Sequence, residues 1–119
     1  MESRTGRGRR GEEEAAAYLA RRGYEIVARN YRCPWGEVDI VAREGGTLVF
    51  VEVRSRTSLA FGLPEESVDR RKRARLRRAA RHYLYSRGGP ADGCRFDVVA
   101  LLLDPAGGVR EIRHLKNAW

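Results

Sequence analysis

The fold is decided by two apolar runs, Glu37-Val-Asp-Ile-Val-Ala-Arg43 and Thr47-Leu-Val-Phe-Val-Glu-Val-Arg54, which Glu44-Gly-Gly46 joins. Both runs are rich in β-branched residues, and the Gly-Gly pair suits a tight turn. The pattern therefore predicts an antiparallel β-hairpin near the centre of the chain.

The same turn predicts which side chains of the hairpin meet. If its two flanking residues pair, Asp39 lies opposite Glu52 and Glu37 lies opposite Arg54. Because side chains alternate along a strand, these four side chains are expected on one face of the sheet. The other face, packed against the core, is then expected to carry Val38, Ile40, Val51 and Val53.

The flanking sequence predicts helices and further strands around this hairpin. Hydrophobic spacing predicts helices over 7–22 and 68–85, strands over 24–28, 95–103 and 109–114, and loops over 29–36 and 55–64. The expected order is α-β-β-β-α-β-β, a single α/β domain over residues 1–119 with a central mixed sheet flanked by helices. Residues 1–7 are expected to form a flexible basic arm.

Composition narrows the possible classes of protein. The 119 residues carry a net charge of +8, and 22 of the 24 basic residues are arginine, so the chain is expected to bind polyanions. Its apolar content excludes a disordered tail, and its apolar runs are too short to span a membrane. No secretory signal is present and Cys33 and Cys94 are expected to be reduced thiols, so the protein is expected in the cytoplasm.

The opposed acids of the hairpin predict a metal site. Asp39 and Glu52 would repel each other unless a cation lies between them or one of them takes up a proton. Carboxylates suit a hard divalent ion, and Mg²⁺ or Mn²⁺ fits this donor set. Such an ion can bind a scissile phosphate and lower the pKa of the attacking water, and Arg54 would add positive charge. The alternative is a pair of hydrated acids with no role.

The second predicted helix carries most of the positive charge. Eight of the twelve residues from 70 to 81 are cationic, which favours a surface that follows a phosphate backbone. The residues expected to contact DNA are Arg71, Lys72, Arg75 and Arg78. The alternative is a solvated cationic face; Lys72 either points towards the acids or lies on that face.

Several motifs together resemble one family. They include Gly8-x-x-Gly11-Glu12, Arg29-Asn-Tyr-Arg32, Gly36-Glu-Val-Asp39, Phe61-Gly62, Arg95-Phe-Asp-Val98 and Asn117-Ala-Trp119. The chain resembles, nearly end to end, the bacterial YraN family of uncharacterised proteins. The resemblance implies a restriction-endonuclease-like (PD-(D/E)xK) fold, similar to archaeal Holliday-junction resolvases, with a nuclease role. It also implies that Glu12, Asp39 and Glu52 hold the metal and that position 54 is the lysine of the motif.

The chain departs from that motif because position 54 is arginine. Arginine stays protonated, so Arg54 can stabilise a phosphate but cannot act as a general base. We therefore expect a nucleic-acid-binding protein that acts as a metal-dependent endonuclease on DNA, at branched or single-stranded ends. The alternatives are a non-catalytic nucleic-acid-binding module with a decayed site, and a protein-interaction adaptor.

Two further expectations follow from the same residues. Tyr31, Trp35 and Phe61 flank the acidic hairpin in the sequence, where they either stack on bases or pack at the rim of the core. A homodimer is expected by analogy with the resolvases, because one cluster per chain would have to be paired to cut two strands.

Overall fold

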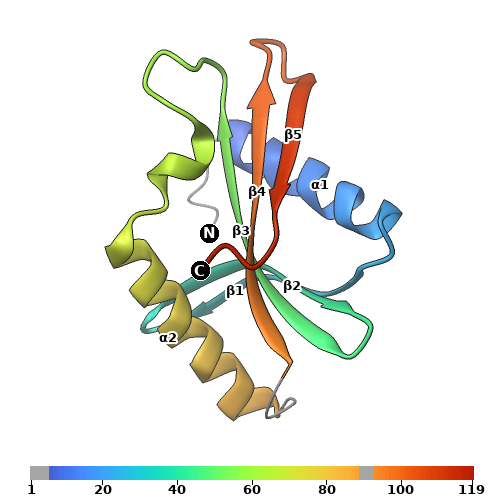
Figure 1. The fold of residues 1–119 in the computed structure, drawn as a ribbon, viewed down its shortest axis with the longest axis vertical. Coiled ribbons are helices and arrows are strands. Elements are labelled where there is room, and N and C mark those ends of the chain that lie inside the picture. The colour runs from blue at the N-terminus through green and yellow to red at the C-terminus, as the bar shows by residue number, and fades with distance from the viewer. Residues whose placement is uncertain (1–5, 89–92) are drawn as a thin grey trace.

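The computed structural model describes residues 6–88 and 93–119. Within them the chain forms two α-helices, five strands and one short 3₁₀-helix (Figure 1). In chain order these are α1 (Gly6–Arg21), β1 (Glu25–Cys33), β2 (Gly36–Glu44), β3 (Thr47–Arg56), η1 (Pro64–Ser67), α2 (Arg70–Arg87), β4 (Cys94–Leu103) and β5 (Val109–Leu115). The predicted order α-β-β-β-α-β-β is confirmed.

The five strands form one mixed sheet in the order β1-β2-β3-β4-β5. Neighbouring strands are antiparallel except β3 and β4, which are parallel. Parallel neighbours need a long crossover, and here the connection runs through η1 and α2. The predicted mixed α/β sheet is therefore confirmed.

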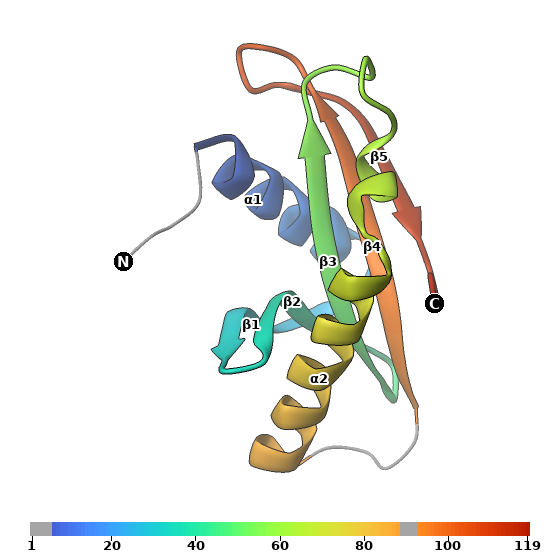
Figure 2. The ribbon, with the colours of Figure 1, turned by 90° about the vertical axis from the view of Figure 1, so that its left-hand side faces the viewer.

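The helices bury opposite faces of the sheet (Figure 2). Ala15 and Leu19 of α1 pack on Val49, Val51 and other side chains of one face. Alternate residues of β3, Leu48 and Phe50, face the other way and pack against α2. The helical stripe predicted from the sequence is buried throughout: Val68, Leu76, Ala79, Ala80 and Tyr83.

The predicted hairpin register is confirmed from the turn to Ile40, which pairs with Val51. The expectation that Val38 shares a face with Ile40 is wrong, because Val38 packs in the α2 cluster and Ile40 in the α1 cluster. The alternation breaks at Asp39, opposite the part of β1 where Asn30 has a left-handed φ of 55°. This irregularity turns Asp39 away from a regular ladder position.

Three predicted boundaries also differ. The expected loop over 29–36 is wrong except at Pro34 and Trp35, since β1 continues to Cys33 and β2 begins at Gly36. The second helix does not begin at Val68: η1 ends before it, and Asp69 caps α2 by accepting a hydrogen bond from the Lys72 amide at 3.0 Å. Of the expected basic arm, residues 6 and 7 belong to α1 and residues 1–5 lie outside the described residues.

No helix in the described part of the chain has the length and apolar character needed to cross a membrane.

Candidate metal centre and nucleic-acid surface

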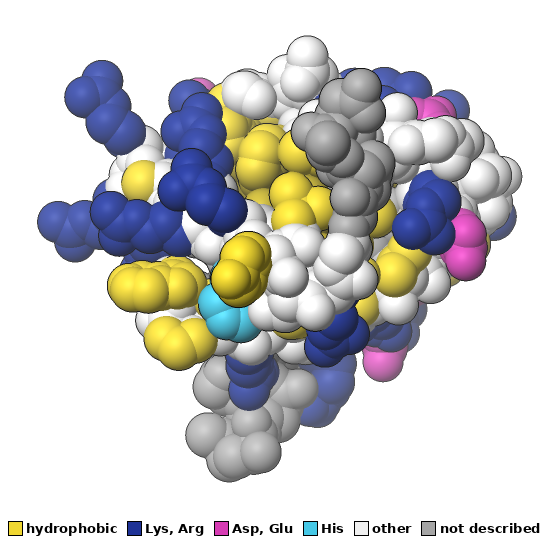
Figure 3. Space-filling model, turned by 90° about the horizontal axis from the view of Figure 1, so that it is seen from below, with side chains coloured by type: hydrophobic (Ala, Val, Ile, Leu, Met, Phe, Trp, Pro, Cys, Tyr) yellow, Lys and Arg dark blue, Asp and Glu magenta, His cyan; other side chains and the backbone are white. Residues whose placement is uncertain are grey.

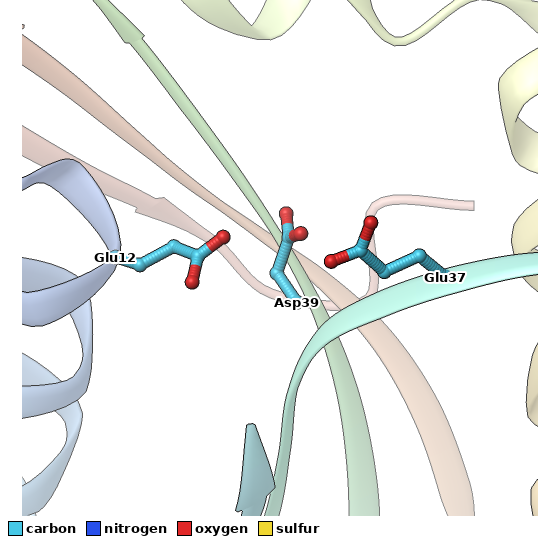
Figure 4. A group of neighbouring side chains, drawn as sticks. All are labelled: Glu12, Glu37 and Asp39. Atoms are coloured by element: carbon cyan, nitrogen blue, oxygen red, sulfur yellow. The ribbon is translucent and has the colours of Figure 1, made fainter. Parts of the chain in front are cut away.

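An acidic cluster forms where α1 meets β2. Glu12, Glu37 and Asp39 each place a carboxylate oxygen within 4.8 Å of the other two. Figure 4 shows Glu12 reaching from α1 and Glu37 from β2 towards Asp39, which lies between them. We call these three residues the acidic cluster.

Glu12 is brought to the cluster by the packing of α1. It precedes Ala15 by three positions and Leu19 by seven, so it lies on the buried stripe of the helix, and it is only 2% exposed. The preceding Gly11 lets the helix approach β3 closely, because a Cβ atom there would lie 3.0 Å from the Ser55 Oγ. A side chain on the buried face and a close helix contact together place Glu12 beside Asp39.

Asp39 is oriented by the neighbouring strand. Its carboxylate Oδ2 accepts a hydrogen bond of 2.8 Å from the Val53 amide of β3, and the residue is 4% exposed. The Glu37 side chain is 30% exposed. The cluster is therefore closed on the α1 side and reaches solvent on the Glu37 side.

Arginines of the sheet lie beside the acids. Arg29 Nη2 is 4.0 Å from Glu12 Oε1, and Arg32 Nε is 3.7 Å from Glu37 Oε2. Both arginines lie in the part of β1 from Arg29 to Cys33, for which the sequence pattern predicted a loop. They contribute positive charge on the β1 side of the cluster, whose three carboxylates would otherwise repel one another.

The donor set fits a small divalent cation. Mg²⁺ prefers oxygen ligands at about 2.0–2.1 Å in octahedral geometry, so two ligands of one ion lie about 3–4 Å apart. The carboxylate oxygens of the cluster lie within 4.8 Å of one another, which small side-chain rotations can close. All three donors are carboxylates, the ligand type that Mg²⁺ and Mn²⁺ share.

The structure brings together Glu12 and Asp39, two of the three residues expected to hold metal, and adds Glu37. Glu52 is not a member of this group; its Oε2 lies 3.3 Å from Arg54 Nε. The hairpin pattern correctly predicted Glu37 on this strand, but it predicted that Glu37 lies opposite Arg54 across the hairpin and not beside Asp39 and Glu12. The Glu-x-Asp spacing on one strand is the signal that could have identified it.

A cavity of about 380 Å³ adjoins the cluster. Glu37, Glu52 and Arg54 line it from the sheet, as expected for side chains on one face, and Lys72 and Arg75 line it from α2. Lys72 thus lies on the side of the acids, which agrees with the prediction that it points towards them rather than lying on a solvated face. We call this space the acidic cavity.

Further cations continue along α2. Arg71 and Arg78 are exposed, and Arg78 lines a second cavity nearer the end of the helix. Figure 3 shows Lys and Arg side chains projecting together from one side of the molecule, next to a group of hydrophobic side chains. The four residues expected to contact DNA all lie on this helix.

A separate polar network lies between β4 and β5. The buried Asp97 accepts hydrogen bonds from Arg95 Nε at 2.9 Å and from the Asn117 amide at 2.9 Å, and His114 Nε2 is 2.8 Å from its carboxylate. Burial raises the pKa of the Asp97 carboxyl, but the hydrogen bonds from His114, Arg95 and Asn117 outweigh it and lower the pKa to about 2. These contacts connect the C-terminal segment to the sheet.

Comparison with known proteins places the chain in a family. It matches the model described as "Uncharacterised protein family UPF0102" over residues 11–101. It is 56% identical over 117 residues to a "UPF0102 protein" of Moorella thermoacetica, covering 98% of each chain. Similar proteins of Beutenbergia cavernae (50% identical, 98% of each chain) and Pelotomaculum thermopropionicum (48% identical, 94% of this chain and 93% of that one) also align. The resemblance to YraN proteins is confirmed, and the chain belongs to the uncharacterised protein family UPF0102.

Proposed function

We propose that the protein binds nucleic acid and acts as a metal-dependent endonuclease on DNA, with Mg²⁺ or Mn²⁺ held by Glu12, Glu37 and Asp39. The observation that carries the proposal is the convergence of three carboxylates from α1 and β2 within 4.8 Å, beside a cavity lined by cations of α2. The carboxylates that would hold a metal then adjoin the cationic side chains that would bind a phosphate backbone, an arrangement suited to metal-dependent hydrolysis of a phosphodiester.

Each side chain has a distinct task in this proposal. The acidic cluster holds the ion, which supplies Lewis-acid polarisation of the scissile phosphate when bound. Arg54 stays protonated and stabilises negative charge that develops on the phosphate oxygens. Lys72 lines the same cavity and adds a second positive charge beside the phosphate. The arginines of α2 hold the backbone.

The experiment that tests the proposal is a cleavage assay on branched, nicked and single-stranded DNA with Mg²⁺ or Mn²⁺. Wild-type protein is expected to cut at least one of these substrates, and Asp39→Ala to lose that activity. The Glu13→Gln variant is the matched control, because Glu13 is exposed on α1 next to Glu12. Equal cleavage by wild type and Asp39→Ala would reject the acidic cluster as the site.

A second candidate function is a non-catalytic nucleic-acid-binding module. It is favoured by Arg54 at the lysine position of the motif, where the guanidinium lies 3.3 Å from Glu52. This candidate predicts salt-dependent binding without any metal-dependent product. Metal-dependent cleavage by wild type rejects this candidate. If wild type binds DNA without cutting it, cleavage gained by the Arg54→Lys variant shows that the module carries a decayed nuclease site.

Cutting both strands of a duplex would require two copies of the chain. Glu12, Glu37 and Asp39 form one cluster within the described residues of one chain, and a two-fold dimer would present two of them. A rate of double-strand cutting that rises more steeply than linearly with protein concentration is the expected sign of such pairing.

A further inference from the structure

A second cavity, of about 420 Å³, lies between the turn joining β1 to β2 and the C-terminal half of α2. It is lined by Trp35 of the turn and by Arg78, Arg81, His82 and Tyr85 of the helix. We call it the aromatic cavity. Its lining combines three rings with two guanidinium groups, a composition unlike that of the acidic cavity.

Two of these rings are unusually exposed for their size. Tyr85 is 92% exposed and Trp35 is 54% exposed. His82 is held in place, because its Nδ1 lies 2.5 Å from the Tyr31 hydroxyl, and the Tyr31 ring packs edge-on against the buried Tyr83 at 5.1 Å. The cavity therefore combines one positioned ring with two rings exposed to solvent, a surface suited to a flat ligand.

The aromatic cavity and the acidic cavity are lined by neighbouring residues of the same two segments, α2 and the turn between β1 and β2. Arg75 lines the acidic cavity and Arg78 lines the aromatic one, and residues three positions apart are neighbours on a helix surface. The turn contributes likewise, since Gly36 lines the acidic cavity and Trp35 the aromatic one. At Gly36 a Cβ atom would lie 3.5 Å from the Arg75 carbonyl oxygen, so the turn packs closely against α2 at Arg75.

The length of this path matches a short piece of one strand. Arg75 and Tyr85 are ten positions apart, and a rise of about 1.5 Å per residue puts them about 15 Å apart along the axis. Stacked nucleotides repeat about every 3.4 Å along a strand, so the path accommodates about four of them. Its cations can contact phosphates while the rings stack on bases.

We propose that the aromatic cavity binds unpaired bases of single-stranded DNA, whose backbone continues along α2 to the acidic cavity. Stacking needs a base whose face is accessible, and the bases of an intact duplex are already stacked on one another. The arginines fit the phosphates, and the exposed rings fit the bases. The inference that a bound strand is cut rests on the proposed function; the stacking of unpaired bases does not.

The test measures binding of a fluorescently labelled oligothymidine by anisotropy, with wild-type protein in EDTA so that cleavage plays no part. Trp35→Ala and Tyr85→Ala are each expected to weaken binding by about fivefold or more, the effect of losing one stacked base. Phe61→Ala is the matched control: although the sequence left open that Phe61 stacks on bases, it is not among the lining residues of either cavity. It is 87% exposed in the loop after β3, at the other end of the molecule from the C-terminal half of α2 (Figure 1). A blunt duplex of the same length is the comparison ligand, and each variant's unfolding midpoint verifies folding.

Several results would overturn the inference. The first is that Trp35→Ala and Tyr85→Ala both bind oligothymidine as tightly as Phe61→Ala does. The second is that these two variants lose as much affinity for the duplex as for oligothymidine. The third is that wild type does not bind oligothymidine at low salt. The proposed function fails separately. If wild type shows no metal-dependent cleavage but its oligothymidine binding depends on Trp35 and Tyr85, the nuclease is rejected and the base-binding cavity stands. If wild type cleaves DNA but neither ring affects oligothymidine binding, the nuclease stands and the base-binding cavity is rejected.

Discussion

Glu12 is the residue whose burial most needs an explanation. A carboxylate that is 2% exposed and lies beside two further acids costs free energy unless a cation offsets it. Arg29, at 4.0 Å, supplies part of the positive charge. A divalent ion in the acidic cluster would add further positive charge beside the three carboxylates.

Replacing Glu12 tests this explanation. In Glu12→Gln we expect Mn²⁺ affinity to fall by about tenfold or more, because one carboxylate ligand and its charge are lost. Without metal the variant should unfold at the same temperature as wild type or above it, since repulsion within the cluster is reduced. Thermal unfolding with and without Mn²⁺ measures both effects.

Glu13→Gln serves as the control for that measurement, because Glu13 is an exposed neighbour with the same chemistry. Saturating Mn²⁺ should raise the unfolding temperature of wild type and of Glu13→Gln, but not that of Glu12→Gln. A similar rise in all three proteins would show that the ion binds elsewhere.

Asp97 predicts how stability depends on pH. Its pKa is lowered from 3.8 to about 2, so its contribution to stability is present above about pH 4 and is lost as pH falls towards 2. The lowered pKa corresponds to a contribution of about 2 kcal/mol to the free energy of unfolding. Urea unfolding of wild type across this range should show the loss, and Asp97→Asn should show a flatter profile in it. Glu111→Gln, at an exposed site on β5, should keep the wild-type profile; a wild-type slope in Asp97→Asn would contradict the assignment.

At the residue scale the sequence identified Glu12 through family resemblance and Asp39 through its place in the hairpin. It did not predict that Asp39 leaves the ladder to accept the Val53 amide, because this depends on the irregularity at Asn30 of the neighbouring strand. The expected opposition of Asp39 and Glu52 assumed a regular ladder. Once Asp39 turns, Glu37 is the acid that joins it.

At the scale of elements, the contact between α1 and β3 controls the site. Gly11 precedes Glu12, and a Cβ atom there would lie 3.0 Å from Ser55 Oγ and 3.2 Å from Ser55 Cβ. Any displacement of α1 moves Glu12 relative to the two acids of β2. The helix position and the metal site are therefore coupled through one glycine.

Substitution of this glycine separates helix position from helix stability. Gly11→Ala gains about 1 kcal/mol of helix propensity, yet we expect it to lower Mn²⁺ affinity severalfold because α1 must move away from Ser55. The double variant Gly11→Ala with Ser55→Gly removes both close atoms and should restore the affinity. Calorimetric titration with Mn²⁺ measures it, and unchanged affinity in Gly11→Ala would show that the contact does not position Glu12.

Elements with strong periodicity were predicted well. The hairpin around Gly45 and the buried stripe of α2 follow from alternation and helical spacing, and both are confirmed. The second half of β1 was missed, because Arg29, Asn30 and Arg32 give no strand pattern. That segment is held in the sheet by pairing with β2 and by Tyr31, which packs against α2. Such tertiary contacts are not visible in local sequence.

At the scale of the whole molecule, the net charge of +8 is unevenly placed. The cations of α2 lie beside the acidic cavity, so binding and chemistry would occur on the same side. This layout predicts that salt weakens DNA binding mainly through α2.

The salt dependence can be assigned to single residues. Arg75→Ala should reduce the slope of log affinity against log salt by about 0.7 for a single strand, because one phosphate contact is lost. Arg110→Ala removes the same charge from an exposed position on β5 and should leave the slope unchanged. Equal slopes for the two variants would indicate that the whole surface attracts DNA without a defined path.

The central claim is that the acidic cluster binds a divalent metal, and a crystal soaked in Mn²⁺ tests it most directly through anomalous scattering. We expect one strong peak within about 2.3 Å of carboxylate oxygens of Glu12, Glu37 and Asp39. Loss of that peak in crystals of Glu12→Gln would confirm the assignment. A peak at another site, or no peak at the cluster at saturating Mn²⁺, would contradict the claim.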